Sequence, residues 1–230
     1  MAELETLSVR RLNRATLARQ LLLAREHVRV TDAVRRLGGL QAQEPRPPFV
    51  ALWTRLEGFD RQSLIRALRR RTVVRATAMR ATLHLLHAGD ARALRPALQP
   101  MLAETAARVA KARGATVDLD AVLPAARELL AERPRTFNEL RPLLAEAFPG
   151  VEERSLGYAV RMHLPLVMLP TGDPWAYPAD TAFARADTAR GGPVATEPDP
   201  AADEALVLRH LGAFGPPSAL SASANAVSAG

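Results

Sequence analysis

Two glutamines, Gln41 and Gln43, form the local pattern in this sequence with the clearest chemical content. On a helix, side chains at i and i+2 diverge by about 200°, whereas on an extended chain they share one face. Gly39 and Pro45 bracket the pair, which favours an irregular or extended stretch with both amides on one side. The alternative is two surface glutamines at the end of a helix.

The chemistry open to such a pair of amides is narrow. A glutamine side chain has no pKa suited to proton transfer, so neither residue can act as a general base. The amide carbonyl can orient a water molecule, and the NH2 group can hold a sugar or phosphate oxygen. Such help is sufficient only when the leaving group is already a good one. Glu44 is a further candidate, although pairing with Arg46 or with solvent is the simpler account of this carboxylate.

A predicted hairpin carries the next group of candidates. Arg75 and His84 lie on its two strands, and Arg80 and Thr82 lie near its turn. A hairpin with such groups could enter the minor groove of DNA or bind phosphate. The alternatives are a solvated hairpin edge for the arginines and a half-buried structural role for the histidine.

Further arginines lie at the ends or on the faces of predicted helices. Arg70 and Arg71 belong to a basic run at a helix C-terminus, where the helix dipole alone favours positive charge and phosphate contact is the functional alternative. Arg154 and Arg161 occupy a later helix at the position of a recognition helix, although residues 121–230 carry net negative charge. The histidines show no metal-ligand spacing, so we expect neither a metal nor another cofactor.

The hydrophobic pattern predicts the elements that must position these residues. In the first half, helices are followed by strands over 72–79 and 81–87, where the apolar period changes to two. A long helix is expected over 90–111, and Thr31 is the expected N-cap of a helix over 32–37.

The second half repeats this plan. A turn at Thr171-Gly172-Asp173-Pro174 separates two strands. The predicted elements are helices over 119–132, 137–148 with Thr136 as its cap, and 152–163, then strands over 165–169 and from 175 onward.

Three helices and a two-stranded wing define the winged variant of the helix-turn-helix. The sequence therefore predicts a mostly α protein with small β-hairpin wings, built from tandem winged helix-turn-helix domains. The expected division is a first winged-helix domain over 8–115, a second over 116–187, a linker over 188–203, and the start of an incomplete third winged helix with a disordered tail over 204–230.

The strings GGLQAQEPRPPFVALWTRLEGF (38–59) and RATAMRATLHLL (75–86) resemble the AlkZ/YcaQ-like winged-helix DNA glycosylases. The resemblance covers roughly residues 8–180 and continues into 204–215. It implies three tandem winged helices and removal of alkylated or cross-linked bases from DNA. The hairpin string of the family, "arginine, glycine, threonine, aliphatic, histidine", maps onto Arg80–His84. Ala81 replaces the usual glycine and is expected to alter that turn.

The resemblance assigns catalysis to Gln41 and Gln43, which match the Gln-x-Gln motif of the family. An N-alkylated purine is cationic, so its glycosidic bond is weakened without an acid catalyst, and two glutamines fit the departure of such a base. The implied reaction is hydrolysis of that N-glycosidic bond during DNA repair. The residues expected to bind DNA are Arg46, Arg70, Arg71, Arg75, Arg80, Thr82 and His84.

Two alternatives to this function stay open at the level of sequence. One is a non-catalytic DNA-binding or regulatory winged-helix protein, and the other is an inactive truncated copy. The residues do not decide whether the target base is flipped out of the helix.

Composition limits the classes of protein. The chain has 230 residues and no cysteine, which excludes disulfides, cysteine-ligated zinc and a thiol nucleophile. It lacks an apolar run long enough for a membrane span and an apolar signal segment, so we expect a cytoplasmic protein. The net charge of +7 is unevenly distributed, with +11 over residues 1–120 and −4 over residues 121–230, and the positive charge is almost entirely arginine, which suits phosphate. We expect damaged double-stranded DNA as the partner and, in the absence of a heptad seam, a monomer.

Overall fold

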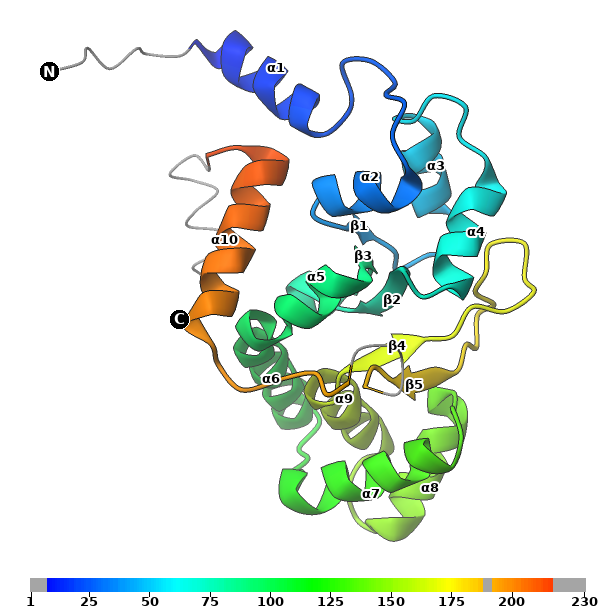
Figure 1. Cartoon of the computed structure of the whole chain (residues 1–230). Coiled ribbons are helices and arrows are strands. Elements are labelled where there is room, and N and C mark those ends of the chain that lie inside the picture. The colour runs from blue at the N-terminus through cyan, green and yellow to red at the C-terminus, as the bar shows by residue number, and fades with distance from the viewer. Residues whose placement is uncertain (1–7, 188–191, 217–230) are drawn as a thin grey trace, which may run out of the picture.

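The computed structural model describes residues 8–187 and 192–216 (Figure 1). Short strands in the middle of the molecule lie between groups of helices. The elements in chain order are α1 (Val9–Arg19), α2 (Val30–Arg36), β1 (Leu40–Gln41), α3 (Pro47–Trp53), α4 (Arg61–Arg69), β2 (Val73–Thr77), the 3-10 turn η1 (Met79–Ala81), β3 (Leu83–His87), α5 (Ala88–Ala93), α6 (Arg95–Ala112), α7 (Leu119–Glu132), α8 (Phe137–Ala147), α9 (Glu153–His163), β4 (Leu166–Met168), β5 (Phe183–Arg185) and α10 (Pro200–Phe214).

The strands form one antiparallel sheet in the order β1-β3-β2-β4-β5. The two predicted hairpins therefore meet, because β2 of the first half pairs with β4 of the second. Arg75 lies opposite Met168 in that pairing, and Ala76 lies opposite Val167. A mostly helical fold with a small antiparallel sheet is thus confirmed. The boundary between units at residues 115 and 116 stays a prediction.

Apolar side chains cover both faces of this sheet. Leu83 and Leu85 of β3 belong to a large cluster shared with α2–α4 and α7–α9, whereas Leu86 belongs to a second cluster under α5 and α6. All five residues of β2 are buried. Because alternate side chains of a strand point to opposite faces, the central strands must be apolar on both sides to fit this position.

Helices with strong local signals begin where the sequence predicts. The helix expected over 119–132 is α7, with the same bounds. Thr136 caps α8 through a capping box, in which the Thr136 hydroxyl accepts from the Glu139 amide and the Glu139 carboxylate accepts from the Thr136 amide. Such a box satisfies two amides that lack intrahelical partners.

Other predictions are wrong at the level of boundaries. Helix α2 starts at Val30, so Thr31 lies inside it and Arg29 precedes it. The long helix expected over 90–111 is divided into α5 and α6. Pro96, near the start of α6, has no N–H for the carbonyl four residues earlier, which separates the two helices.

The second hairpin also differs from its prediction. The return strand begins at Phe183 and not at 175, because the chain first folds into a turn. The Thr171 amide donates to the Ala176 carbonyl, and Ala176 has a φ of 69°. Tyr177 then enters the core instead of joining a strand.

The last helix begins inside the segment predicted to be a linker. Helix α10 begins at Pro200 after Asp199, whose side chain accepts from the Ala201 amide, so the predicted linker is shorter than 188–203. The helix returns to α1 (Figure 1). Directly after α1, Gln20 Nε2 donates to the Ala213 carbonyl at 2.7 Å. The tail predicted to be disordered lies, from residue 217 onward, outside the described residues. Among the described helices, none is long and apolar enough to span a membrane.

Candidate active site

The Gln-x-Gln segment is extended and lies at the edge of the sheet. Gln41 and Gln43 are exposed, while Ala42 between them is only 1% exposed, which is the alternation of a strand. The amide of Ala42 donates to the Leu83 carbonyl at 2.7 Å, and Gln41 lies opposite His84. The structure therefore confirms an extended segment with both glutamines exposed.

Gly39 allows β1 to approach β3 so closely. Its φ is 101°, a conformation that favours glycine. A Cβ at this position would lie 2.5 Å from Leu86 Cδ2 and 3.1 Å from the Leu85 carbonyl oxygen. Any larger residue would push the glutamine segment away from the sheet.

Both glutamine side chains reach toward the β2–β3 hairpin. Arg80 Nη2 donates to Gln41 Oε1 at 3.3 Å, and the Leu83 amide donates to Gln43 Oε1 at 3.3 Å. Because both partners are donors, they require the oxygen of each amide. With each oxygen turned to the hairpin, the NH2 groups are directed away from it. A second lone pair on each oxygen can still accept from a water molecule.

Arg75 holds the backbone of the same segment from inside the protein. Its Nε donates to the Ala42 carbonyl at 2.9 Å, and its Nη2 donates to the Gln43 carbonyl at 3.0 Å. The side chain is 3% exposed and its guanidinium lies 4.8 Å from the ring centre of Tyr177. Burial lowers the pKa of Arg75 and raises the pKa of Tyr177. Arg75 is therefore placed to position the glutamines and not to reach a ligand.

The hairpin turn that presents Arg80 is of the type I′ kind. Arg80 and Ala81 have φ values of 54° and 55°, and the Thr82 amide donates to the Met79 carbonyl at 3.2 Å. This turn requires positive φ at both central residues, for which asparagine and glycine are preferred. A glycine at position 81 would fit this backbone without strain, whereas Ala81 adopts it at a cost.

His84 is buried and points to its own strand. It is 3% exposed, and its Nδ1 lies 3.0 Å from the Thr82 carbonyl oxygen. Burial lowers the pKa of His84 below its ordinary value of 6.5. A buried neutral imidazole is not available to a phosphate without repacking, so the structure gives no support to the predicted DNA contact of His84, nor to that of Arg75.

The remaining predicted residues are divided between two places. Arg46 is exposed after the glutamine segment and lies 5.3 Å from the ring centre of Trp175. Arg70 and Arg71 precede β2, whereas Arg80 follows it, and five residues of strand separate these ends by roughly 16 Å. The structure thus gathers the glutamines, Arg80 and Thr82, and places Arg70 and Arg71 elsewhere.

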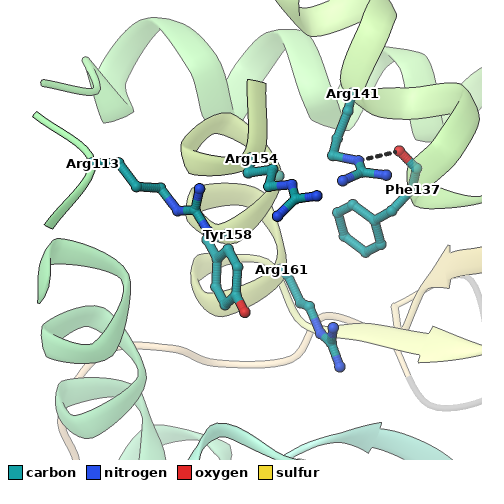
Figure 2. Close-up of a pocket in the computed structure, with 7 residues that line it drawn as sticks. Arg113, Phe137, Arg141, Arg154, Tyr158 and Arg161 are labelled. Atoms are coloured by element: carbon teal, nitrogen blue, oxygen red, sulfur yellow. Dashed lines mark hydrogen bonds between the residues drawn. The ribbon is translucent and has the colours of Figure 1, made fainter. Parts of the chain in front are cut away.

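A second group of polar residues escaped the sequence analysis. Arg113, Arg141 and Tyr158 line a pocket together with Arg154 and Arg161 (Figure 2). A signal was present, because positions 154, 158 and 161 have the i, i+4, i+7 spacing of one helix face. Arg113 and Arg141 come from other helices and had no such local signal. Among the described residues, no cluster of three or more His, Cys, Asp or Glu could hold a metal ion.

Comparisons with known proteins agree with this architecture. A model of the family described as DNA glycosylase AlkZ-like matches residues 34–224. The solved structure of Streptomyces sahachiroi DNA glycosylase AlkZ is similar, with a TM-score of 0.76 and 22% sequence identity over 93% of this chain and 59% of that chain. At this identity the likeness shows a shared fold, and our chain spans 59% of that chain's length. No curated protein matches the sequence.

The fold and the exposed glutamine pair define a mostly helical protein with a small antiparallel sheet that carries the Gln-x-Gln motif. Since the family model matches most of the sequence, the chain belongs to the AlkZ-like DNA glycosylase family. This confirms the resemblance read from residues 38–59 and 75–86.

Proposed function

We propose that this chain acts on DNA as a glycosylase that hydrolyses the N-glycosidic bond of alkylated or cross-linked bases. The observation that carries the proposal is the exposed glutamine pair, whose amides are oriented by Arg80 and by the Leu83 amide. Family membership supports the same reaction class. In its finer architecture, we propose two winged-helix units over 8–115 and 116–187, with α10 as the start of a third.

In the proposed reaction the bond between C1′ of the sugar and the nitrogen of the cationic base breaks first or in concert with water attack. The bonding electron pair leaves with the base and neutralises its charge. Water adds its oxygen to C1′ and releases a proton to solvent. No side-chain acid is needed, because an already charged base is a good leaving group, and this fits a site built from amides.

Gln41 and Gln43 have complementary roles in this scheme. Their second oxygen lone pairs orient the attacking water, and the same carbonyl dipoles stabilise the positive charge that develops on the sugar. Their NH2 groups hold a sugar or phosphate oxygen. Arg75 acts as a positioning residue through the carbonyls of Ala42 and Gln43.

We propose that DNA binding uses the members of the predicted set that are exposed (Arg46, Arg70 and Arg80) or half-buried (Arg71 and Thr82). Arg80 and Thr82 would contact the strand that carries the lesion, and Arg46 would contact the adjacent backbone. Arg70 and Arg71, at the other end of β2, would contact phosphates farther along the duplex. For His84 we propose support of the hairpin in place of DNA contact.

The test uses duplex DNA that carries N7-alkylguanine, followed by heat or alkali to convert abasic sites into strand breaks. We expect breaks with the wild-type chain and none above background with Gln41→Ala/Gln43→Ala. Arg127→Ala, which changes an exposed arginine of α7, is the matched control and should retain activity. DNA binding without breaks would favour a non-catalytic DNA-binding protein, and breaks that survive the double substitution would remove the glutamines from catalysis.

A further inference from the structure

A pocket of about 310 Å³ lies between α8 and α9, beside the end of α6 (Figure 2). This size is at the lower end of the range of about 300–1,000 Å³ typical of small-ligand sites. The pocket is outside the glutamine segment, and its walls are strongly basic. Its lining residues are Arg113, Phe137, Arg141, Arg154, Gly157, Tyr158 and Arg161.

Carboxylates neutralise only part of this charge. Arg113 pairs with Glu152 at 3.5 Å, and Arg141 lies 3.8 Å from Glu153, both at the long end of ion-pair distances. Within residues 8–187 and 192–216, neither Arg154 nor Arg161 has a carboxylate partner. Four arginines thus line the pocket, and within the described residues only two of them have a carboxylate partner.

Arg161 is the inner donor of the pocket. Its Nε donates to Thr77 Oγ1 at 3.1 Å, and its guanidinium lies 5.9 Å from the ring centre of Phe183. Burial lowers the pKa of Arg161, which means that the surroundings do not stabilise its charge fully. A guanidinium held in this way has terminal N–H groups in a fixed direction, which is the geometry that phosphate recognition needs.

Gly157 allows Arg141 to form the neighbouring wall. A Cβ at position 157 would lie 2.9 Å from both Cγ and Cδ of Arg141. Arg141 is fixed in turn, because its Nε donates to the Phe137 carbonyl at 2.9 Å and its Nη2 donates to Asn138 Oδ1 at 2.6 Å. A glycine inside a helix costs about 1 kcal/mol relative to alanine. At position 157 the absence of a side chain leaves space for Arg141.

We propose that this pocket binds a phosphate group, and that in the working protein it is a phosphate of the DNA backbone. Arg154 and Arg161 supply N–H forks, and the hydroxyl of Tyr158, a residue that is 37% exposed, supplies a further donor. The assignment to DNA rests on the proposed function. It is favoured by location, because Arg161 contacts β2 at Thr77, which pairs with Leu83, the residue whose amide holds Gln43.

The spacing of the strands gives the distance between the glutamine segment on β1 and the strand β2 that Arg161 contacts. Two strand spacings separate β1 from β2, which amounts to about 10 Å. At about 3.4 Å per nucleotide along the duplex axis, one strand covers this distance in a few nucleotides. The pocket lies beyond β2, on α8 and α9, so it would hold a phosphate at least a few positions from the damaged base.

The first measurement is duplex DNA affinity of the full chain, by fluorescence anisotropy from 50 to 200 mM salt. For Arg154→Ala we expect several-fold weaker binding that is equal for all sequences, and a salt slope smaller in magnitude by about 0.9, the value for one lost phosphate contact. Tyr158→Phe should weaken binding less, and the exposed-arginine control Arg127→Ala should match the wild type. If Arg154→Ala also matches the wild type, the assignment of the pocket to a DNA phosphate is overturned while the proposed DNA function stands.

The second measurement separates the pocket from the proposed function. It follows the melting temperature of the wild type, Arg154→Ala and Gly157→Ala with inorganic pyrophosphate. We expect pyrophosphate to raise the melting temperature of the wild type but not of either variant. Gly157→Ala should lose the response because its methyl group displaces Arg141. If the wild type does not bind duplex DNA but shows this rise, the phosphate site stands, its source is a free phosphate and the proposed function fails. Failure of both responses would overturn the site altogether.

Discussion

At the scale of single residues, the candidate site depends on the buried Arg75, which forms no ion pair with a carboxylate in the described part of the chain. Arg75 bridges two consecutive backbone carbonyls of the glutamine segment with one planar guanidinium. A lysine has the same charge but no planar fork, so it cannot hold both carbonyls in the same way. The backbone that carries both glutamines is therefore held by a residue that the sequence analysis had assigned to DNA contact, while Arg80 and the Leu83 amide orient the side chains.

Arg75→Lys tests this role. We expect kcat for release of an alkylated base to fall by about 100-fold, because a small misplacement of catalytic groups is costly, while duplex affinity stays close to that of the wild type. Single-turnover kinetics and anisotropy on the same preparation provide the two values. A loss of affinity with kcat unchanged would show that Arg75 contacts DNA after all.

His84 predicts how stability depends on pH. Its pKa in the folded protein is below the ordinary 6.5, because burial disfavours the charged ring. As pH falls through 6.5, the unfolded chain binds a proton that the folded chain does not, so folding stability should decrease. Urea unfolding at pH 7.5 and pH 5.5 measures this loss. His84→Asn should reduce the difference between the two pH values, and an unchanged difference would contradict the assignment.

At the scale of elements, the sequence predicted those that depend on interactions between neighbouring residues and missed those that depend on residues far apart in the chain. Helix α8 could be predicted because Thr136 and Glu139 form a local signal at its start. Strand β1 could not, since two residues have no measurable period and only pairing with β3 makes them a strand. The exposed state of Gln41 and Gln43 was still predictable, because Gly39 and Pro45 exclude a regular helix there. The clamp by Arg75 was not, as it joins positions 32 and 33 residues apart.

The turn of the β2–β3 hairpin predicts that an alanine-to-glycine substitution there changes stability in the opposite direction to the same substitution in a helix. Ala81→Gly should raise the free energy of unfolding by about 1 kcal/mol, because glycine adopts a positive φ without steric cost. The same substitution at the exposed Ala107, within α6, should lower it by about 1 kcal/mol. Chemical denaturation of both variants provides the comparison. Equal destabilisation by the two glycines would contradict the type I′ turn.

At the scale of the whole molecule, α10 ties the end of the described chain to its beginning. Its Arg209 donates to the buried Asp90 at 2.8 Å, and Arg35 of α2 lies 3.4 Å from the same carboxylate. The Gln20 side chain donates to the Ala213 carbonyl at the other end of α10. Helices far apart in the sequence therefore share one buried acid.

Asp90→Asn should lower stability by about 1–3 kcal/mol, because Arg209 and Arg35 lose their charged acceptor in a buried place. Asp32→Asn is the matched control. It makes the same chemical change in an exposed ion pair, that of Asp32 with Arg29. Surface ion pairs contribute only about 0–1 kcal/mol to stability. Thermal and urea unfolding of both variants would measure the difference. Equal effects would mean that Asp90 does not anchor α10.

The pairing of β2 with β4 has a consequence for how the polypeptide can be divided. Cutting the chain in the loop near Gly114 would leave β2 with a row of unsatisfied amides and carbonyls along one side, which invites association with another strand. The two fragments should therefore be aggregation-prone and poorly soluble when each is produced alone. When both are produced in the same cell, they should copurify as a stoichiometric pair. The protein would then behave as one inseparable body, even though its sequence reads as a repeat.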